Sequence, residues 1–352
     1  MNILGTKKLA ELCQKMSNLV ALVHVSTAYC HCDRKEIDEV IYPPPVDPEK
    51  FLEAVEWMDD QMLEALTLKI LKDRPNTYTF TKVLAENYLV EQCHNLPVVI
   101  VRPSIVTGTW REPLLGWTDN FNGPTGMMVA IIIIFVLNFF ALDRSLSVPV
   151  YNCTSGPVNK ITWAEWNTTV IDLLIQNPSC HVVRYPSGTF RTSQFLNKIW
   201  RILDHYIPAY LFDFVGLLIG RKRRLTRLYT KLHRAVDSLE YFTMNEWTFH
   251  CNNVLKLFQQ LEEKDKEVFN FSVESLNWST YLQDYVLGTR RFVLKEDECT
   301  LPTARRNIKR LYIYSRLTYV LVSIFIWMML IYRSKRLQIF WMFPWSFLNR
   351  KR

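Results

Sequence analysis

The stretch "RPNTYTFTKVLAENYL", residues 74–89, decides the fold together with the segments on either side of it. A helix is predicted over 78–93, directly after a Pro-Asn-Thr turn. Before the helix, "LVALVHVST", 19–27, is an apolar, Val-rich run that is typical of a buried parallel strand, and "LPVVIVRP", 96–103, has the same character. Strand, helix and strand in alternation predict an α/β fold with a parallel sheet.

Tyr78 and Lys82 stand four residues apart, so both side chains project from one face of the predicted helix. A nearby ammonium lowers the pKa of a phenol, which can then pass a proton to a carbonyl oxygen while hydride reaches the carbon. Ser26 and Thr27 end the first strand, at the sheet edge where ligands bind. These residues predict a reductive site; a chance Tyr-Lys spacing on an ordinary helix is the alternative.

The rest of the chain reads as helix and loop. Helices are predicted over 3–16 and, for the most part, over 50–72. A turn-rich loop, 116–126, runs directly into the apolar stretch "MMVAIIIIFVLNFFAL", 127–142, for which burial in the protein is favoured over entry into a membrane. From about residue 150 to about residue 300 the pattern is amphipathic and helical.

Composition excludes a largely disordered chain. Of the 352 residues 49% are hydrophobic and 22% charged, and the net charge of +8 favours anionic partners such as phosphates, CoA or lipid headgroups. The run "RKRRLTRLYTKLHR", 221–234, carries seven Lys or Arg and no acid. No nucleic-acid-binding motif accompanies it, so we predict no nucleic-acid partner and interpret the run as a solvated helix face or a site for CoA phosphates or headgroups.

Eight cysteines are scattered without a C-x-x-C pair, and "MNILGTKKLAEL" carries charge where a secretory signal is apolar. Reduced thiols on the cytosolic side are therefore expected. Cys30-His31-Cys32 has the residue types of half a metal site. No second half with ligand spacing accompanies it, so we predict no metal.

The C-terminal region predicts membrane attachment. Residues 317–332, "LTYVLVSIFIWMMLIY", are uncharged, with Arg316 before them and cations after them. Sixteen residues are slightly short of a membrane span, but flanking cations that reach the headgroups extend the usable length. A second apolar run, 337–348, precedes the basic terminus. We predict a membrane anchor here; a buried core helix is the alternative.

Several motifs together are similar to one family. "VHVSTAYC", "EVIYPPPVDP", "DRPNTYTFTKVLAE", "VVIVRPSIV" and "GWTDNFNGPTG" resemble the alcohol-forming fatty acyl-CoA reductases of the extended short-chain dehydrogenase/reductase superfamily. "LHRAVDSLEYFTMNEWTF" and "FNFSVESLNWSTYLQDYVLGTRRFVLKED" resemble the helical C-terminal domain of that family. The resemblance covers roughly 1–126 and 148–352.

This resemblance implies two successive NADPH-dependent reductions, from fatty acyl-CoA to a bound aldehyde and then to a fatty alcohol. By motif position, Tyr78 would be the acid, and Lys82 would tune Tyr78 and hold the nicotinamide ribose. Thr27 would bind the carbonyl oxygen of the substrate, with Ser26 as second choice. The implied partners are fatty acyl-CoA and membrane lipid.

The implied cofactor, NADPH, would contact Lys82, Pro103 and Ser104. The family begins with a G-x-x-G-x-x-G turn that holds the pyrophosphate at a helix N-terminus. This chain has 10 glycines, and the part of the sequence before Gly108 contains no such turn. The chain is therefore expected to start inside the fold, with a partial sheet and weak NADPH binding. The alternative function is a non-catalytic, membrane-tethered remnant that pairs with a full-length relative.

The expected fold class is α/β, a partial doubly wound, Rossmann-like parallel sheet followed by a helical domain and a C-terminal membrane segment. Residues 1–147 would form the incomplete reductase domain, with an internal deletion near 127–147. Residues 148–300 would form the helical domain and 301–352 the membrane anchor. The resemblance implies the peroxisomal membrane, with the catalytic part facing the cytosol.

Overall fold

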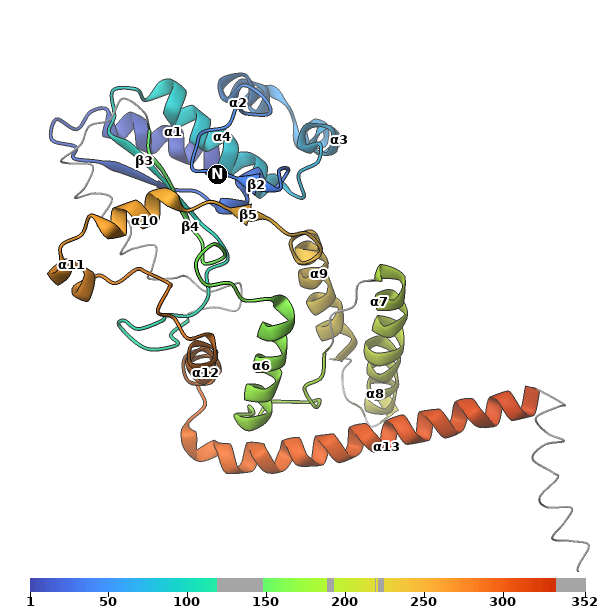
Figure 1. The fold of residues 1–352 in the computed structure, drawn as a ribbon. Helices are drawn as coiled ribbons and strands as arrows, with labels where there is room; N and C mark the ends of the chain where they lie inside the picture. Colours follow the sequence, from blue (N-terminus) through green and yellow to red (C-terminus); the bar gives the residue numbers. More distant parts are fainter. Residues whose placement is uncertain (119–147, 189–192, 219, 221–224, 334–352) are drawn as a thin grey trace, which may run out of the picture.

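Three parallel strands form the central sheet of the computed structural model, which describes all residues except 119–147, 189–192, 219, 221–224 and 334–352. The strands are β1 (Leu22–Val25), β3 (Val98–Pro103) and β4 (Val150–Cys153), in the order β1-β3-β4 (Figure 1). The predicted strands at 19–27 and 96–103 correspond to β1 and β3. The α/β class with a parallel sheet is therefore confirmed.

Residues of the central strand alternate between two cores. Val98 and Ile100 pack with Tyr88 and Leu89 on one face, whereas Val99 and four other buried residues pack on the other face. The residues of that second core are Val99, Val101, Tyr151, Leu257 and Phe271. Burial on both faces explains why β3 is a continuous apolar run in the sequence.

Helices α1 (Asn2–Cys13) and α4 (Thr77–Gln92) pack against each other over one face of the sheet (Figure 1). They correspond to the helices predicted over 3–16 and 78–93. The start of α4 is fixed by Asn76, whose side chain accepts a hydrogen bond from the backbone N–H of Thr79 at 3.0 Å. This cap sets where the first turn of α4 begins, one residue before Tyr78.

The region 50–72 contains two helices, α2 (Pro48–Trp57) and α3 (Asp60–Leu71). The break between them has a local cause. Met58 adopts an extended conformation, and the Asp59 carboxylate accepts a hydrogen bond from the backbone N–H of Met62 at 2.8 Å, which starts a new helix.

The second face of the sheet is covered by α10 (Asn252–Gln259), a segment more than a hundred residues beyond β3 in the sequence (Figure 1). Two short strands, β2 (Glu36–Ile37) and β5 (Thr248–Phe249), pair in parallel and join the N-terminal and C-terminal parts of the chain. The 3₁₀ helix η1 (Ala28–His31) links β1 to β2.

The helical part follows β4, so the sheet takes its third strand from beyond residue 147, the expected domain boundary. In chain order the remaining elements are α6 (Trp163–Gln176), α7 (Gln194–Trp200), η2 (Arg201–Tyr206), α8 (Ile207–Leu218), α9 (Leu225–Met244), α11 (Glu263–Val268), α12 (Trp278–Gly288), η3 (Thr289–Val293), η4 (Glu298–Thr300) and α13 (Leu301–Arg333). The helical C-terminal region is thus as expected.

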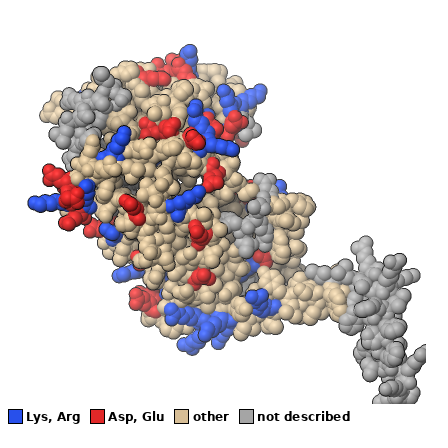
Figure 2. All heavy atoms as spheres, viewed as in Figure 1, with Lys and Arg blue, Asp and Glu red and all other residues tan. Residues whose placement is uncertain are grey.

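Helix α13 projects away from the rest of the molecule, and its projecting described part carries few charged side chains (Figures 1 and 2). Within the described residues, the stretch Glu298–Met329 is long and apolar enough to cross a membrane, and its most apolar window is entirely unburied. The apolar runs at 127–142 and 337–348, and the internal deletion expected near 127–147, lie outside the described residues.

Candidate active site

The predicted site residues from β1 and β3 meet at the carboxyl edge of the sheet. Ser26 follows β1, and its backbone N–H donates to the Val101 carbonyl at 2.8 Å. The Thr27 hydroxyl donates to the carbonyl of Pro103, the last residue of β3, over 3.5 Å. Ser104 comes next and donates its N–H to the Cys153 carbonyl at 3.2 Å.

Helix α4 brings Tyr78 and Lys82 to the same edge. The Lys82 Nζ donates to the carbonyl oxygen of Val25, the last residue of β1, at 2.7 Å. Tyr78 lies one turn earlier, with its ring centroid 5.9 Å from that Nζ and about half of its surface exposed. A phenol and an ammonium therefore stand beside the hydroxyl-bearing end of β1.

The electrostatics of Tyr78 differ from the expectation. Burial, followed by the neighbouring Cys30, raises the pKa of Tyr78, and a hydrogen bond with Thr27 acts in the opposite direction. Burial lowers the pKa of Lys82, against the charge of Glu86. The Lys82 ammonium engages the Val25 carbonyl and lies beside the tyrosine ring, so the expected lowering of the Tyr78 pKa is absent from this arrangement.

Two buried polar atoms near the end of β1 have no hydrogen-bond partner, the Ser26 Oγ and the His24 Nε2. Burial, then the charge of Lys82, lowers the pKa of His24 to about 4, so this imidazole is neutral at pH 7. An unsatisfied buried hydroxyl is costly unless a bound molecule completes it. The Ser26 hydroxyl lies near the Cys30 thiol, whose pKa it lowers against the effect of burial.

A cavity of about 250 Å³ lies beyond the carboxyl ends of β3 and β4. Pro103 and Ser104, both predicted to line the cofactor pocket, belong to its wall. The other walls come from the segments 105–112, 153–158, 251–258 and 267–281, and many of their side chains are apolar. Tyr78, Lys82, Ser26 and Thr27 do not line the cavity, and the Thr27–Pro103 hydrogen bond connects the two places.

The loop after β3 is held against helix α12 by Tyr281. Its hydroxyl donates to the Gly108 carbonyl at 2.7 Å and also contacts the Thr107 hydroxyl. Close backbone contact supports this seam, because a side chain on Gly288 would meet the carbonyl oxygen of Gly116. Helix α12 of the helical part thus shapes a cavity that opens at the sheet edge.

A buried ion pair lies behind the site and was not predicted from the sequence. The Glu86 carboxylate accepts from Arg102 Nε at 2.9 Å and from Arg102 Nη2 at 2.6 Å, and both side chains are fully buried. Arg102 also donates to the carbonyl oxygens of Asp38 and Val40. The sequence positions of the two residues were the available signal for this ion pair. Glu86 lies one helical turn after Lys82, and Arg102 directly precedes Pro103.

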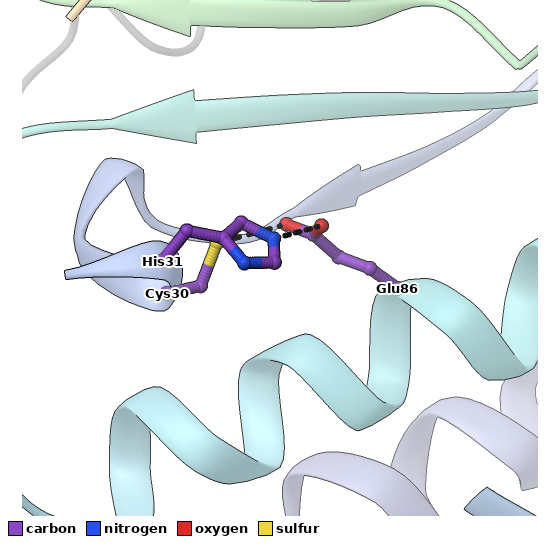
Figure 3. Close-up of side chains that lie close together, drawn as sticks. All are labelled: Cys30, His31 and Glu86. Atoms are coloured by element: carbon purple, nitrogen blue, oxygen red, sulfur yellow. Dashed lines mark hydrogen bonds and ion pairs between the residues drawn. The ribbon is translucent and has the colours of Figure 1, made fainter. Parts of the chain in front are cut away.

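Cys30 and His31 complete this cluster from η1 (Figure 3). Burial alone would raise the pKa of Glu86, but the hydrogen bond from His31 and the charge and hydrogen bonds of Arg102 hold it below its ordinary value. Burial raises the pKa of the Cys30 thiol and lowers the pKa of His31. At pH 7 the cluster thus contains one carboxylate, one guanidinium, a neutral thiol and a neutral imidazole.

The side chains of Cys30, His31 and Glu86 have the donor types of a metal site. One ligand atom from each of Cys30, His31 and Glu86 lies within 4.8 Å of the others. However, Arg102 bonds both carboxylate oxygens of Glu86, and the Cys30 thiol is protonated. These donors are committed to the ion pair, so the cluster is explained as a structural link between α4, η1 and β3.

Comparison with known proteins identifies two matching domain families and several similar full-length proteins. An NAD-binding domain described as "Male sterility protein" matches residues 1–153, and a second domain of the same description matches residues 204–296. Fatty acyl-CoA reductase 1 of Gallus gallus and of Homo sapiens are each 38% identical over 369 residues, which cover 97% of this chain and 72% of the relative. Fatty acyl-CoA reductase 2 of Mus musculus is 37% identical over 373 residues, covering 99% and 72%.

Proposed function

The chain belongs to the fatty acyl-CoA reductase family, and on that premise we propose that it reduces a fatty acyl-CoA to a fatty alcohol with NADPH. The observation that supports this most is the convergence of Tyr78, Lys82 and Thr27 at one sheet edge, where Lys82 reaches β1 from α4. Parallel sheets bind ligands at that edge.

Each side chain has a role in the proposed reaction. The Tyr78 phenol donates a proton to the carbonyl oxygen of the substrate. The Thr27 hydroxyl exchanges the Pro103 carbonyl for that oxygen and holds it in place, with the Ser26 hydroxyl as second donor. Lys82 exchanges the Val25 carbonyl for the cofactor ribose, where its charge lowers the pKa of Tyr78. Two NADPH molecules, bound in succession, would supply one hydride each: the first reduction would release CoA as the thiol and leave an aldehyde, and the second would convert the aldehyde to the alcohol.

The residues fit one end of this cofactor. Lys82, at the end of β1, and Pro103 and Ser104, at the end of β3, would contact the nicotinamide ribose. For the pyrophosphate end, the sequence contains no G-x-x-G-x-x-G turn. The proposal of NADPH as cofactor therefore rests on the residues that would contact the nicotinamide end and on membership of the family.

The apolar cavity is the proposed site for the acyl chain. It lies directly beyond Pro103, so an acyl chain inside it would present its carbonyl carbon towards Thr27 and Tyr78. Val254, Phe258 and Phe271 provide apolar lining. Under this assignment the sheet part carries the reductive groups and the helical part holds the chain of the substrate.

We further propose the domain division and the location. Residues 1–147, with β4 added, form the reductase part, 148–300 contribute the helical part, and 301–352 anchor the chain in a membrane. The peroxisomal membrane, with the catalytic part in the cytosol, is the proposed location. The exposed, apolar part of α13 supports the anchor.

The second candidate function is a non-catalytic, tethered chain that pairs with a full-length relative. One observation favours it: among the described residues, β1 pairs through one side only, with β3. An unpaired strand edge is a template for another strand. In that case the site would be completed by the partner.

The test is an assay of the purified full chain with palmitoyl-CoA and either NADPH or NADH. Oxidation of NADPH with matching formation of hexadecanol, and slower reaction with NADH, is expected. Calorimetric titration with NADPH accompanies it. No alcohol, together with NADPH binding weaker than about 1 mM, would reject catalysis and favour the tethered chain, because a micromolar site is stronger by several kcal/mol.

A further inference from the structure

Helices α7, η2 and α8 continue one another without a break over 194–218 and form a single rod, called here the 194–218 rod. One side of the rod is apolar and exposed along its full length. Its members recur every three or four residues, the spacing of one helical face, and include Phe195, Leu203, Ile207, Leu211, Phe214 and Leu218. Leu211 and Phe214 are 61% and 60% exposed.

Three of the four Lys, Arg, Asp and Glu residues of the rod contact other parts of the protein, whereas the fourth, Lys198, is exposed. Arg201 pairs with Asp237 at 2.5 Å, and Asp204 pairs with Arg184 at 2.5 Å. Asp213 is buried, and its carboxylate accepts from the first two backbone N–H groups of α9. From Ile202 to Leu218 the exposed side of the rod is therefore an uncharged apolar surface, which soluble proteins rarely leave uncovered.

The rod lies beside α13, the proposed membrane anchor. Tyr319 of α13 donates a hydrogen bond to the Asp204 carboxylate at 3.2 Å. In Figure 1 the α8 end of the rod lies next to α13, and apart from α13 the rod is the outermost helix on the side towards which α13 projects. If α13 crosses a bilayer, the rod therefore lies beside the place where α13 enters it.

Helix α9, which packs against the rod, carries exposed positive charge. At this contact the Nδ1 atom of His205 on the rod lies 3.0 Å from the Nε2 atom of His233 on α9. The exposed α9 cations Arg227, Lys231 and Arg234 recur every three or four residues and therefore lie along one side of the helix. Cations beside an apolar helix surface suit the boundary between anionic headgroups and acyl chains.

We propose that the 194–218 rod lies in the plane of the membrane, with its exposed side among the lipid acyl chains and the cations of α9 against anionic headgroups. This inference rests on the membrane anchor proposed above. A spanning helix alone lets the protein rotate about the helix axis. A second, in-plane helix fixes the orientation of the sheet edge and its cavity relative to the bilayer.

A second copy of the chain is the competing occupant of this surface. The contact with α13 and the neighbouring cations favour lipid, because lipid offers both an apolar and an anionic layer. The experiment must therefore separate lipid contact from contact between copies.

Photo-crosslinking of the full chain makes this separation. p-Benzoylphenylalanine replaces Phe214 on the rod, Met328 on α13 or Trp57 on α2, positions that are 60%, 60% and 68% exposed. Each variant is reconstituted in vesicles of phosphatidylcholine and phosphatidylserine and irradiated. Adducts are identified by mass spectrometry and on gels. Unchanged circular dichroism and elution volume verify that the variants fold.

Lipid adducts at both Phe214 and Met328, and none at Trp57, are expected. Lipid adducts at Met328 with none at Phe214, or a crosslinked dimer through Phe214, would overturn the in-plane rod while leaving the anchor intact. A lipid adduct at Phe214 with none at Met328 would reject the anchor and keep the rod on the membrane. No lipid adduct at either position would overturn both.

Discussion

At the scale of single residues, Glu86 connects helix α4 to strand β3 behind the candidate site. It follows Lys82 by one turn on α4, and its carboxylate holds the guanidinium of Arg102, the residue before Pro103. The distance between α4 and the end of β3 therefore depends on this pair. A buried pair adds little net stability compared with apolar residues, but it leaves a strong penalty when one partner is lost.

The first prediction concerns this pair. Glu86→Gln should lower the free energy of unfolding by about 3–5 kcal/mol, because the Arg102 charge stays buried without its carboxylate. The double variant Glu86→Leu/Arg102→Met should cost less. Urea denaturation measures both. Glu246→Gln, in the exposed pair with Lys160, is the matched control and should change stability by about 0.5 kcal/mol or less.

A second prediction tests the proposed acid. Tyr78→Phe should lower kcat for alcohol formation by about 100-fold or more, because it removes the donor to the carbonyl oxygen. Lys82→Ala should lower kcat and weaken cofactor binding together. Tyr314→Phe, at an exposed tyrosine of α13, should leave the rate unchanged. Turnover near wild type in Tyr78→Phe would remove this residue from the mechanism.

The third prediction concerns His24, whose pKa falls from 6.5 to about 4 in the folded chain through burial and the charge of Lys82. Between these values the unfolded chain binds a proton that the folded chain does not. Stability from this residue is therefore complete above pH 6.5 and declines as the pH falls towards 4, by on the order of 3 kcal/mol.

Thermal melts over this pH range measure the effect in wild type and in His24→Leu. The variant replaces an imidazole whose Nε2 has no partner, so it should fold and show a shallower decline. Parallel pH profiles for the two proteins would show that another group causes the decline.

At this scale the sequence predicted the proximity of Tyr78, Lys82 and Thr27 better than their electrostatics. The helical spacing of Tyr78 and Lys82 and the position of Thr27 after a strand are local patterns, and the structure brings them together. The direction of the Tyr78 pKa depends on burial and on which acceptor Lys82 selects. Both are properties of tertiary packing, as is the contact between Glu86 and Arg102.

At the scale of elements, the long periodic segments were predictable and the short ones were not. Strands β1 and β3 and helices α1 and α4 lie within a few residues of their predicted positions. β4 has only four residues and follows a long apolar run, so no period distinguishes it, and pairing with β3 defines it. The break between α2 and α3 depends on one capping carboxylate, Asp59.

The fourth prediction tests how α12 holds the loop after β3. In Gly288→Ala the new Cβ would lie 1.9 Å from the Gly116 carbonyl oxygen, a backbone atom that cannot move aside freely. Loss of about 1–3 kcal/mol in the free energy of unfolding and weaker acyl-CoA binding are expected. Gly5→Ala, also within a helix but with open space around it, should instead stabilise by about 0.5–1 kcal/mol.

At the scale of the whole molecule, the cavity is a product of distant segments. Its walls come from the loop after β3, from β4 and from α10 and α12, and its lining runs from Pro103 to Tyr281 in the sequence. No local sequence pattern predicts that these segments meet, because their contact is a property of tertiary packing. The exposure of the 194–218 rod could not be predicted for the same reason. In the sequence, an exposed apolar helix face has the same pattern as a face that packs in the core.

The last prediction concerns the anchor, which belongs to the whole molecule because it decides where the protein resides. Residues 317–332 carry no charge, and transfer of their apolar surface into lipid is favourable. Deletion of 311–352 should therefore release the chain from carbonate-resistant membrane association, and 311–352 fused to a soluble reporter should acquire it.

If the deleted chain still associates, washing with high salt and with carbonate distinguishes the reasons. The in-plane rod would hold the chain by apolar contact with headgroup attraction, and such peripheral association is weaker than a span and is lost in carbonate. The same chain with 127–142 also deleted tests that apolar run. A reporter fusion that stays soluble would show that 311–352 is not a membrane anchor, whatever the rod does.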